Sequence, residues 1–89
     1  MMIYKLVVDD KAKKQLKKID HTQGQIIVNW IDKNLVGTEN PRQYGKSLSG
    51  SLKEFWRYRV GSYRILAKID DNVVTIFVID IDHRNKVYR

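Results

Sequence analysis

Residues 55–65 read Phe-Trp-Arg-Tyr-Arg-Val-Gly-Ser-Tyr-Arg-Ile, and this stretch decides the fold expected of the chain. The alternation on either side of Gly61-Ser62 predicts two strands joined by a two-residue turn, and glycine at the first central position suits a type II′ hairpin. If these two residues form the loop, Arg59 lies directly across from Arg64.

Strand alternation divides the side chains of this hairpin between two faces. One face takes the cations Arg57, Arg59, Arg64 and Lys68, and the other takes Trp56, Tyr58, Val60, Tyr63, Ile65 and Ala67. Like charges directly opposite one another destabilise a sheet, so arginine across from arginine suggests an anionic ligand. For a single arginine pair, a solvated face is the favoured explanation. Several cations on one face of a basic chain favour a phosphate-binding surface.

The length and charge of the chain agree with this interpretation. Eighty-nine residues predict one small domain over 1–89. Seventeen Lys and Arg against ten Asp and Glu give a net charge of +7. Such a charge favours a polyanionic partner, which is a nucleic acid, an acidic protein or an anionic membrane.

Several classes of site are excluded or disfavoured by composition. Cysteine is absent, which removes disulfides, thiolate metal sites and a cysteine nucleophile. The two histidines, His21 and His83, are far apart in sequence, so we expect no metal site. No Gly-rich phosphate loop, Walker motif or Ser-His-Asp order appears, and no cofactor is expected. Neither a signal peptide nor a membrane span is evident, which predicts a soluble, cytoplasmic protein without membrane association.

The N-terminal half predicts a strand followed by two helices. The strand covers 3–8, and Asp9 or Asp10 caps a helix over 11–19. A capping box, Thr22 to Gln25, opens the second helix. Its buried stripe comprises Ile27, Trp30, Ile31 and Leu35, and Gly37 follows its end. The first helix carries Lys13, Lys14, Lys17 and Lys18, which form either a solvated face or an RNA-binding surface.

The C-terminal half predicts a long loop and three strands. The loop covers 38–53 and brings Arg42, Lys46 and Lys53 toward the ligand of the sheet. After the hairpin, a turn at Asp71-Asn72 leads into 73–81, a β-branched run typical of a central strand. The order is therefore β-α-α-β-β-β, an α+β fold with a helical hairpin on one side of a small, antiparallel-rich sheet.

The terminal segment supplies groups suited to metal-free RNA cleavage. This reaction needs a base for the 2′-hydroxyl proton, an acid for the leaving 5′-oxygen, and cations for the phosphorane. Histidine, lysine and tyrosine exchange protons, while arginine remains charged and binds oxygen atoms. His83, Arg84 and Tyr88 follow the central strand, and we expect the sheet to hold them near Arg64.

Three motifs resemble the RelE side of the RelE/ParE toxin superfamily. They are Trp56–Ile65 with its Arg-x-Arg-Val-Gly-x-Tyr-Arg core, Val78–Arg84 ending in His-Arg, and Val87-Tyr88. The resemblance implies a RelE-like fold and the toxin of a type II toxin–antitoxin pair. It implies a ribosome-dependent, metal-independent endoribonuclease that cuts mRNA in the A site and is neutralised by a cognate antitoxin. Its implied partners are therefore the antitoxin, the ribosome and mRNA.

The resemblance also implies roles for individual residues. Arg64 matches the phosphate-stabilising arginine, Arg84 a second catalytic arginine and Tyr88 the C-terminal tyrosine. Lys46 lies near a loop position with an acid–base group, and His83 is a further candidate for that role. The expected RNA-binding residues are Arg57, Arg59, Lys13, Lys14, Lys17, Lys18, Lys53 and Lys68.

Two other functions remain open from the sequence. One is a ParE-like toxin that inhibits DNA gyrase by binding. The other is a non-catalytic, basic nucleic-acid-binding domain. The His83-Arg84 pair and Tyr88 favour the nuclease, because a gyrase inhibitor has no need of proton-transfer groups there.

Overall fold

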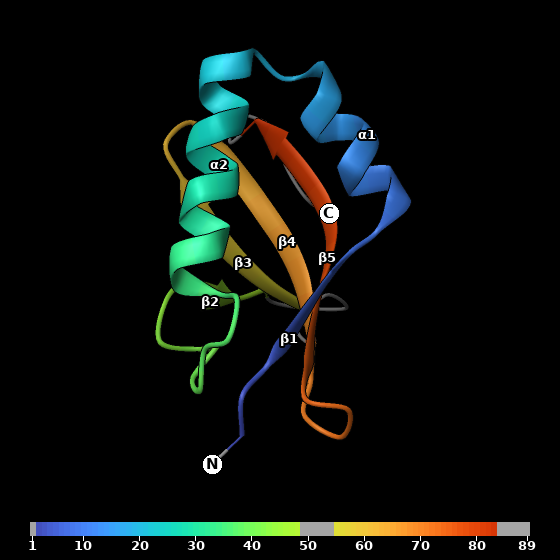
Figure 1. The fold of residues 1–89 in the computed structure, drawn as a ribbon, viewed down its shortest axis with the longest axis vertical. Coiled ribbons are helices and arrows are strands. Elements are labelled where there is room, and N and C mark those ends of the chain that lie inside the picture. The colour runs from blue at the N-terminus through green and yellow to red at the C-terminus, as the bar shows by residue number, and fades with distance from the viewer. Residues whose placement is uncertain (1, 49–54, 84–89) are drawn as a thin grey trace.

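The structure is a computed structural model that describes residues 2–48 and 55–83. Its elements run β1 (Lys5–Val8), α1 (Asp10–Lys18), α2 (His21–Asn34), β2 (Lys46–Ser47), β3 (Phe55–Val60), β4 (Tyr63–Asp70) and β5 (Thr75–His83). Two helices pack on a five-stranded mixed sheet, which confirms the predicted α+β class (Figure 1). In this part of the chain, neither helix has the length and apolar character needed to cross a membrane.

The sheet has the order β1-β5-β4-β3-β2. β1 runs parallel to β5, and every other neighbouring pair is antiparallel. The N-terminal strand therefore joins the sheet beside the last strand described, and β5 becomes internal, as its β-branched sequence predicts. The predicted strand over 73–81 begins two residues before β5 does. Asp70 Oδ1 accepts hydrogen bonds from the backbone N–H groups of Asn72 and Val73 and so holds these residues in the turn.

The central hairpin forms with the predicted register. Val60 pairs with Tyr63 and Arg59 with Arg64. Gly61 has φ of +57°, and Ser62 does not share a positive φ, which is the pattern of a type II′ turn. A two-residue turn fixes register locally, and for this reason the sequence sufficed to predict it.

The apolar side of the hairpin forms the core with the helices. Tyr58 and Ile65 are fully buried against Ile27 and Ile31 of α2. Ala12 of α1 is also fully buried, and α1 packs along β5. Trp30, predicted as core, is only partly buried at the edge of this cluster, with its ring 5.5 Å from that of Tyr58. The cationic side chains of the hairpin therefore belong to the opposite face of the sheet.

The start of α2 differs from the predicted capping box. Asp20 is the N-cap residue, and its Oδ2 accepts hydrogen bonds from the backbone N–H groups of Thr22 and Gln23. Asp20 takes this role because a carboxylate one turn before the helix interior reaches the free N–H groups and complements the helix dipole. The helix consequently begins at His21, one residue before the predicted cap.

The predicted loop over 38–53 contains a short strand. Residues Lys46–Ser47 form β2 and pair with Trp56 and Arg57 at the edge of the sheet. Residue propensities do not identify a two-residue strand in a polar segment, so this strand was not predicted. The first strand and first helix lie where predicted, with ends shifted by one or two residues.

Candidate functional site

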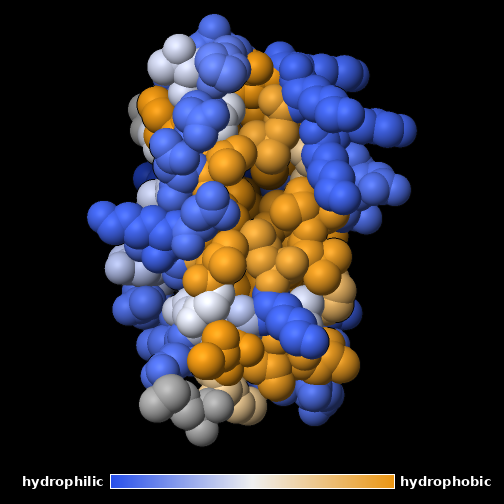
Figure 2. Space-filling view, viewed as in Figure 1, coloured by the Kyte–Doolittle hydropathy of each residue, from blue (hydrophilic) through white to orange (hydrophobic). Residues whose placement is uncertain are grey.

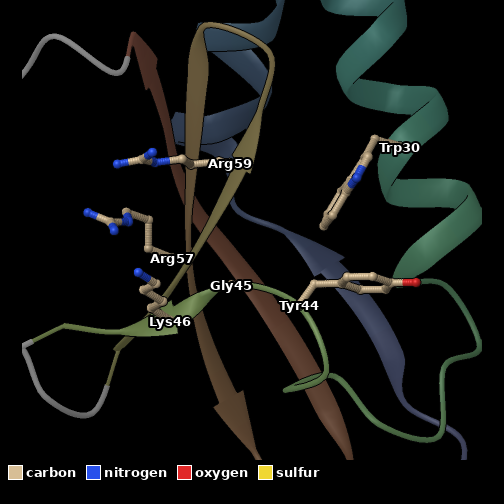
Figure 3. A pocket seen from close by; sticks show the side chains of 6 residues that line it. All are labelled: Trp30, Tyr44, Gly45, Lys46, Arg57 and Arg59. Carbon is tan, nitrogen blue, oxygen red and sulfur yellow. The ribbon is translucent and has the colours of Figure 1, made fainter.

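Five cations from three strands share the side of the sheet opposite the helices. We call Lys46, Arg57, Arg59, Arg64 and Lys68 the basic sheet face. Alternation and register place them together, since Arg57 lies across from Lys46 and Arg59 across from Arg64. Figure 3 shows the side chains of Lys46, Arg57 and Arg59 extending to the same side. The face thus combines lysine ammonium and arginine guanidinium groups, which suit phosphate oxygens.

The structure places a carboxylate of β5 beside the arginines of the hairpin. Asp82 of β5 lies directly across from Arg64, which therefore has Arg59 on one side and Asp82 on the other. An opposite charge on the neighbouring strand offsets the repulsion between the two arginines. The Arg59–Arg64 pair alone therefore does not require an external anion, and the case for a phosphate-binding surface depends on the whole basic sheet face.

Aromatic side chains of β3 hold the segment before Lys46. Trp56 Nε1 donates a hydrogen bond to the Tyr44 carbonyl oxygen at 2.6 Å, and Tyr58 Oη donates to the Pro41 carbonyl oxygen at 2.5 Å. Burial raises the pKa of Tyr58, so its hydroxyl remains a protonated donor throughout the neutral range. These two bonds fix the approach of the chain to β2.

Gly45 permits this close approach. It has φ of +80°, and a Cβ there would overlap the carbonyl oxygen of Arg57 and lie 2.8 Å from Trp56 Nε1. Any side chain would therefore displace β2 from β3. The residues that place Lys46 beside Arg57 are thus Gly45, Trp56 and Tyr58, and a glycine before a basic residue was the only sequence signal for them.

Arg42 forms an internal ion pair. Its guanidinium binds both carboxylate oxygens of Asp71, at 3.1 and 3.0 Å, and Tyr4 Oη donates to the same carboxylate at 2.6 Å. The hydrogen bonds from Arg42 and Tyr4 lower the pKa of Asp71, and the bond to Asp71 raises the pKa of Tyr4. Arg42 therefore ties the loop to the β4–β5 turn instead of extending toward the sheet ligand as predicted.

His83 lies at the end of β5 on the helix side. It pairs with Tyr63, whose ring it meets edge-on with centroids 5.4 Å apart. Both residues line a cavity of about 370 Å³ beside the α1–α2 connection. Because neighbouring residues of a strand face opposite ways, the structure separates the His83 ring from the face that contains Arg64.

The remaining predicted residues fall into two groups. Lys13, Lys14, Lys17 and Lys18 are exposed on α1 and belong to the helix layer. Lys53, Arg84 and Tyr88 lie outside the described residues. Within the described ranges, no cluster of three or more His, Asp or Glu side chains is arranged to hold a metal ion.

A model of the family described as the ParE toxin of type II toxin–antitoxin system, parDE, matches residues 6–88. The chain therefore belongs to this family and is a type II toxin–antitoxin toxin of the RelE/ParE superfamily.

Individual relatives agree with the family assignment. The chain is 36% identical to toxin RelG of Mycobacterium tuberculosis over 52 residues, which are 58% of this chain and 60% of RelG. It matches a chain of the M. tuberculosis RelBE2 toxin–antitoxin complex with a TM-score of 0.82 and 28% identity, over 92% of this chain and 99% of the other. A chain of the intact E. coli RelBE toxin–antitoxin complex matches with a TM-score of 0.73 and 26% identity, over 97% of this chain and 99% of the other.

Proposed function

We propose that this protein is a ribosome-dependent endoribonuclease that cuts mRNA in the A site without a metal. The observation that supports it best is the register, which gathers Lys46, Arg57, Arg59 and Arg64 on one face from three strands. A phosphodiester undergoing attack gains negative charge on its equatorial oxygens, and fixed cations stabilise that charge. The similarity to RelE chains supports the same activity.

The cleavage is an internal transfer. The 2′-oxygen bonds to the adjacent phosphorus as its proton passes to a base, and the bond to the 5′-oxygen breaks as an acid supplies a proton. Arg64 and Arg84 stabilise the phosphorane, Tyr88 positions the scissile phosphate, and Lys46 or His83 transfers a proton. Lys46 lies within the basic sheet face, whereas His83 would act from the end of β5.

Primer extension on mRNA from a translation reaction tests this proposal. The nuclease predicts new 5′ ends inside codons of ribosome-bound mRNA, and none on the same mRNA without ribosomes. Intact mRNA on stalled ribosomes would contradict it, and the non-catalytic, basic nucleic-acid-binding alternative would then explain the basic charge.

A second candidate is inhibition of DNA gyrase, and the matching family description favours it, because it names the ParE toxin. A gyrase reaction with the purified protein separates the two. Accumulation of cleaved DNA complexes with mRNA left intact would support the gyrase inhibitor.

We also propose a cognate antitoxin as the physiological partner. Several similar structures are toxin–antitoxin complexes. A segment that folds on binding wraps a large surface, and acidic residues would complement the +7 charge. Hydrogen exchange on the complex should show protection in 55–69 or 82–89, while protection limited to 11–35 would mean inhibition without site coverage.

A further inference from the structure

A cavity of about 330 Å³ lies at the outer edge of the sheet. It is lined by Trp30, Tyr44, Gly45, Lys46, Arg57 and Arg59 (Figure 3). Its volume lies at the lower end of the range of small-molecule sites, about 300–1,000 Å³. α2, the segment before β2, and β3 each contribute to it, so the site exists only in the folded chain.

Two aromatic rings form one wall of this cavity. Trp30 and Tyr44 meet edge-on with centroids 5.9 Å apart, and Trp30 also contacts Tyr58. Tyr44 is 44% exposed, although the backbone that holds it is fixed by the Trp56 hydrogen bond. An aromatic ring kept in place but left open to solvent is a stacking surface for a planar ligand.

The opposite wall is the edge of β3. Pairing with β2 ends at Arg57, so no described strand lies beside the stretch from Tyr58 to Val60. In a two-residue hairpin the residues flanking the loop exchange hydrogen bonds, and the N–H and C=O of Arg59 therefore point away from β4 toward this edge. A donor and an acceptor side by side suit the polar edge of a nucleobase.

The positive charge at the rim of the cavity indicates that one end of the ligand is anionic. The side chains of Lys46, Arg57 and Arg59 leave the cavity on the side away from the aromatic rings (Figure 3). A ligand that fills this space is planar and apolar at one end and anionic at the other. A nucleotide within a single strand of RNA has these properties.

We propose that this cavity binds one nucleobase of the RNA substrate. The base stacks on the exposed Tyr44 ring, with Trp30 beside it, and its flanking phosphates contact the cations of the basic sheet face. The site thereby selects which nucleotide of the strand is placed next to Arg64. The inference deepens the proposed nuclease function and rests on it for the identity of the polymer.

Binding of uncleavable RNA tests the inference apart from catalysis. The probes are short, fluorescently labelled oligoribonucleotides, 2′-O-methylated at every position, in which a single abasic nucleotide is moved along the strand. Anisotropy at low salt should show that one abasic position lowers the affinity of the wild-type protein about tenfold, the usual worth of one stacked base. When the protein is Tyr44→Ala, the same abasic nucleotide in the RNA should change the affinity by less than about twofold.

Matched variants distinguish the loss of the Tyr44 ring from a loss of folding. Tyr44→Ala keeps the carbonyl that accepts from Trp56 and loses only the edge-on contact with Trp30, so its melting temperature should fall by no more than a few degrees. Tyr44→Phe should keep the abasic penalty, as should Val36→Ala, which alters a side chain that is 50% exposed and does not line the cavity. Lys46→Ala should weaken intact and abasic RNA equally, because it removes a phosphate contact only.

Two outcomes would overturn the inference. One is an abasic penalty that is equal in the wild type and in Tyr44→Ala, and the other is the absence of RNA binding by the wild type. Base-dependent binding without cleavage on the ribosome would overturn the proposed nuclease and leave the nucleobase site standing.

Discussion

The basic sheet face and helix α1 both have dense positive charge, but they hold it in different ways. On the sheet, cations from three strands are brought together by backbone pairing and lie beside a cavity. On α1, exposed lysines follow one another along a single helix, at the border of an apolar band between the two helices (Figure 2). Charge density alone would rank these regions equally, whereas their geometry differs, and we propose phosphate chemistry for the sheet alone.

Rigidity accounts for much of this difference. Strand register fixes the spacing of Arg57, Arg59 and Arg64, and arginine presents its donors in a planar fork. The lysines of α1 are flexible point charges on solvated stems. A groove of about 290 Å³ also lies between α1 and α2, lined by Leu16, Ile19 and Val28 among others. The helix side therefore differs from the sheet side in chemistry as well as in shape.

The strongest test of the comparison is Arg64→Ala. We expect ribosome-dependent cleavage to fall by about 10²–10³, the typical effect of losing one charged transition-state donor. Circular dichroism and melting should stay close to the wild type, because Arg64 lies on the face opposite the core. Wild-type cleavage by the folded variant would contradict the assignment of the phosphate site to the sheet.

His83→Gln tests whether proton transfer extends beyond the basic sheet face. We expect single-turnover cleavage on ribosome-bound mRNA to slow by about 10²-fold, the usual worth of general acid–base catalysis. His21→Gln is the matched control, since His21 is exposed at the start of α2, and it should cleave normally. Equal rates for both variants would shift the acid–base role to Lys46 or Tyr88.

Gly45→Ala tests whether β2 must be held against β3. Its Cβ would overlap the Arg57 carbonyl oxygen at a positive φ, and we expect a loss of about 2–3 kcal/mol in the free energy of unfolding, together with weaker cleavage. Gly24→Ala is the control within α2. There a Cβ meets only the Leu16 carbonyl oxygen at 3.7 Å, and we expect a gain of about 0.5–1 kcal/mol. Denaturant titration measures both, and equal effects would refute the steric argument.

The salt dependence of ribosome binding compares the two charged regions directly. Each lost phosphate contact should flatten the slope of log K against log salt by roughly 0.7 on single-stranded RNA. We expect the Arg57→Glu/Arg59→Glu pair to flatten it by about twice that amount, and the Lys13→Glu/Lys17→Glu pair by less. An unchanged slope for the second pair would show that the lysines of α1 are only solvated.

Asp71→Asn should give the smallest effect. Its ion pair with Arg42 is exposed, so we expect a loss of at most about 1 kcal/mol at neutral pH. The pKa of Asp71 is lowered in the folded state, so its contribution is present above the unfolded value of about 4 and is lost as the pH falls through the folded value. Urea titrations at pH 7 and pH 3 should therefore show the variant and the wild type converging in acid, and a constant difference would contradict the linkage.

The hairpin could be predicted from the sequence, whereas several contacts around the site could not. The Gly61-Ser62 turn, the Arg59–Arg64 pair and the central position of the last strand were all predicted correctly. The β2 strand, the Asp20 cap and the Arg42–Asp71 pair were not. β2 and the Arg42–Asp71 pair join segments that only packing brings together. The Asp20 cap is local, and it was missed because Thr22 and Gln25 offer a competing capping pattern.

The sequence by itself determined the hairpin, its register, the division of its side chains into an apolar and a cationic face, and the family resemblance. These follow from alternation and from a two-residue turn, which act over a few neighbouring residues. Only the tertiary structure placed Lys46 beside Arg57, set Asp82 across from Arg64, turned His83 toward Tyr63, and enclosed a cavity between Trp30 and β3. These placements join residues far apart in the chain, and they exist because the burial of one core fixes how distant segments meet.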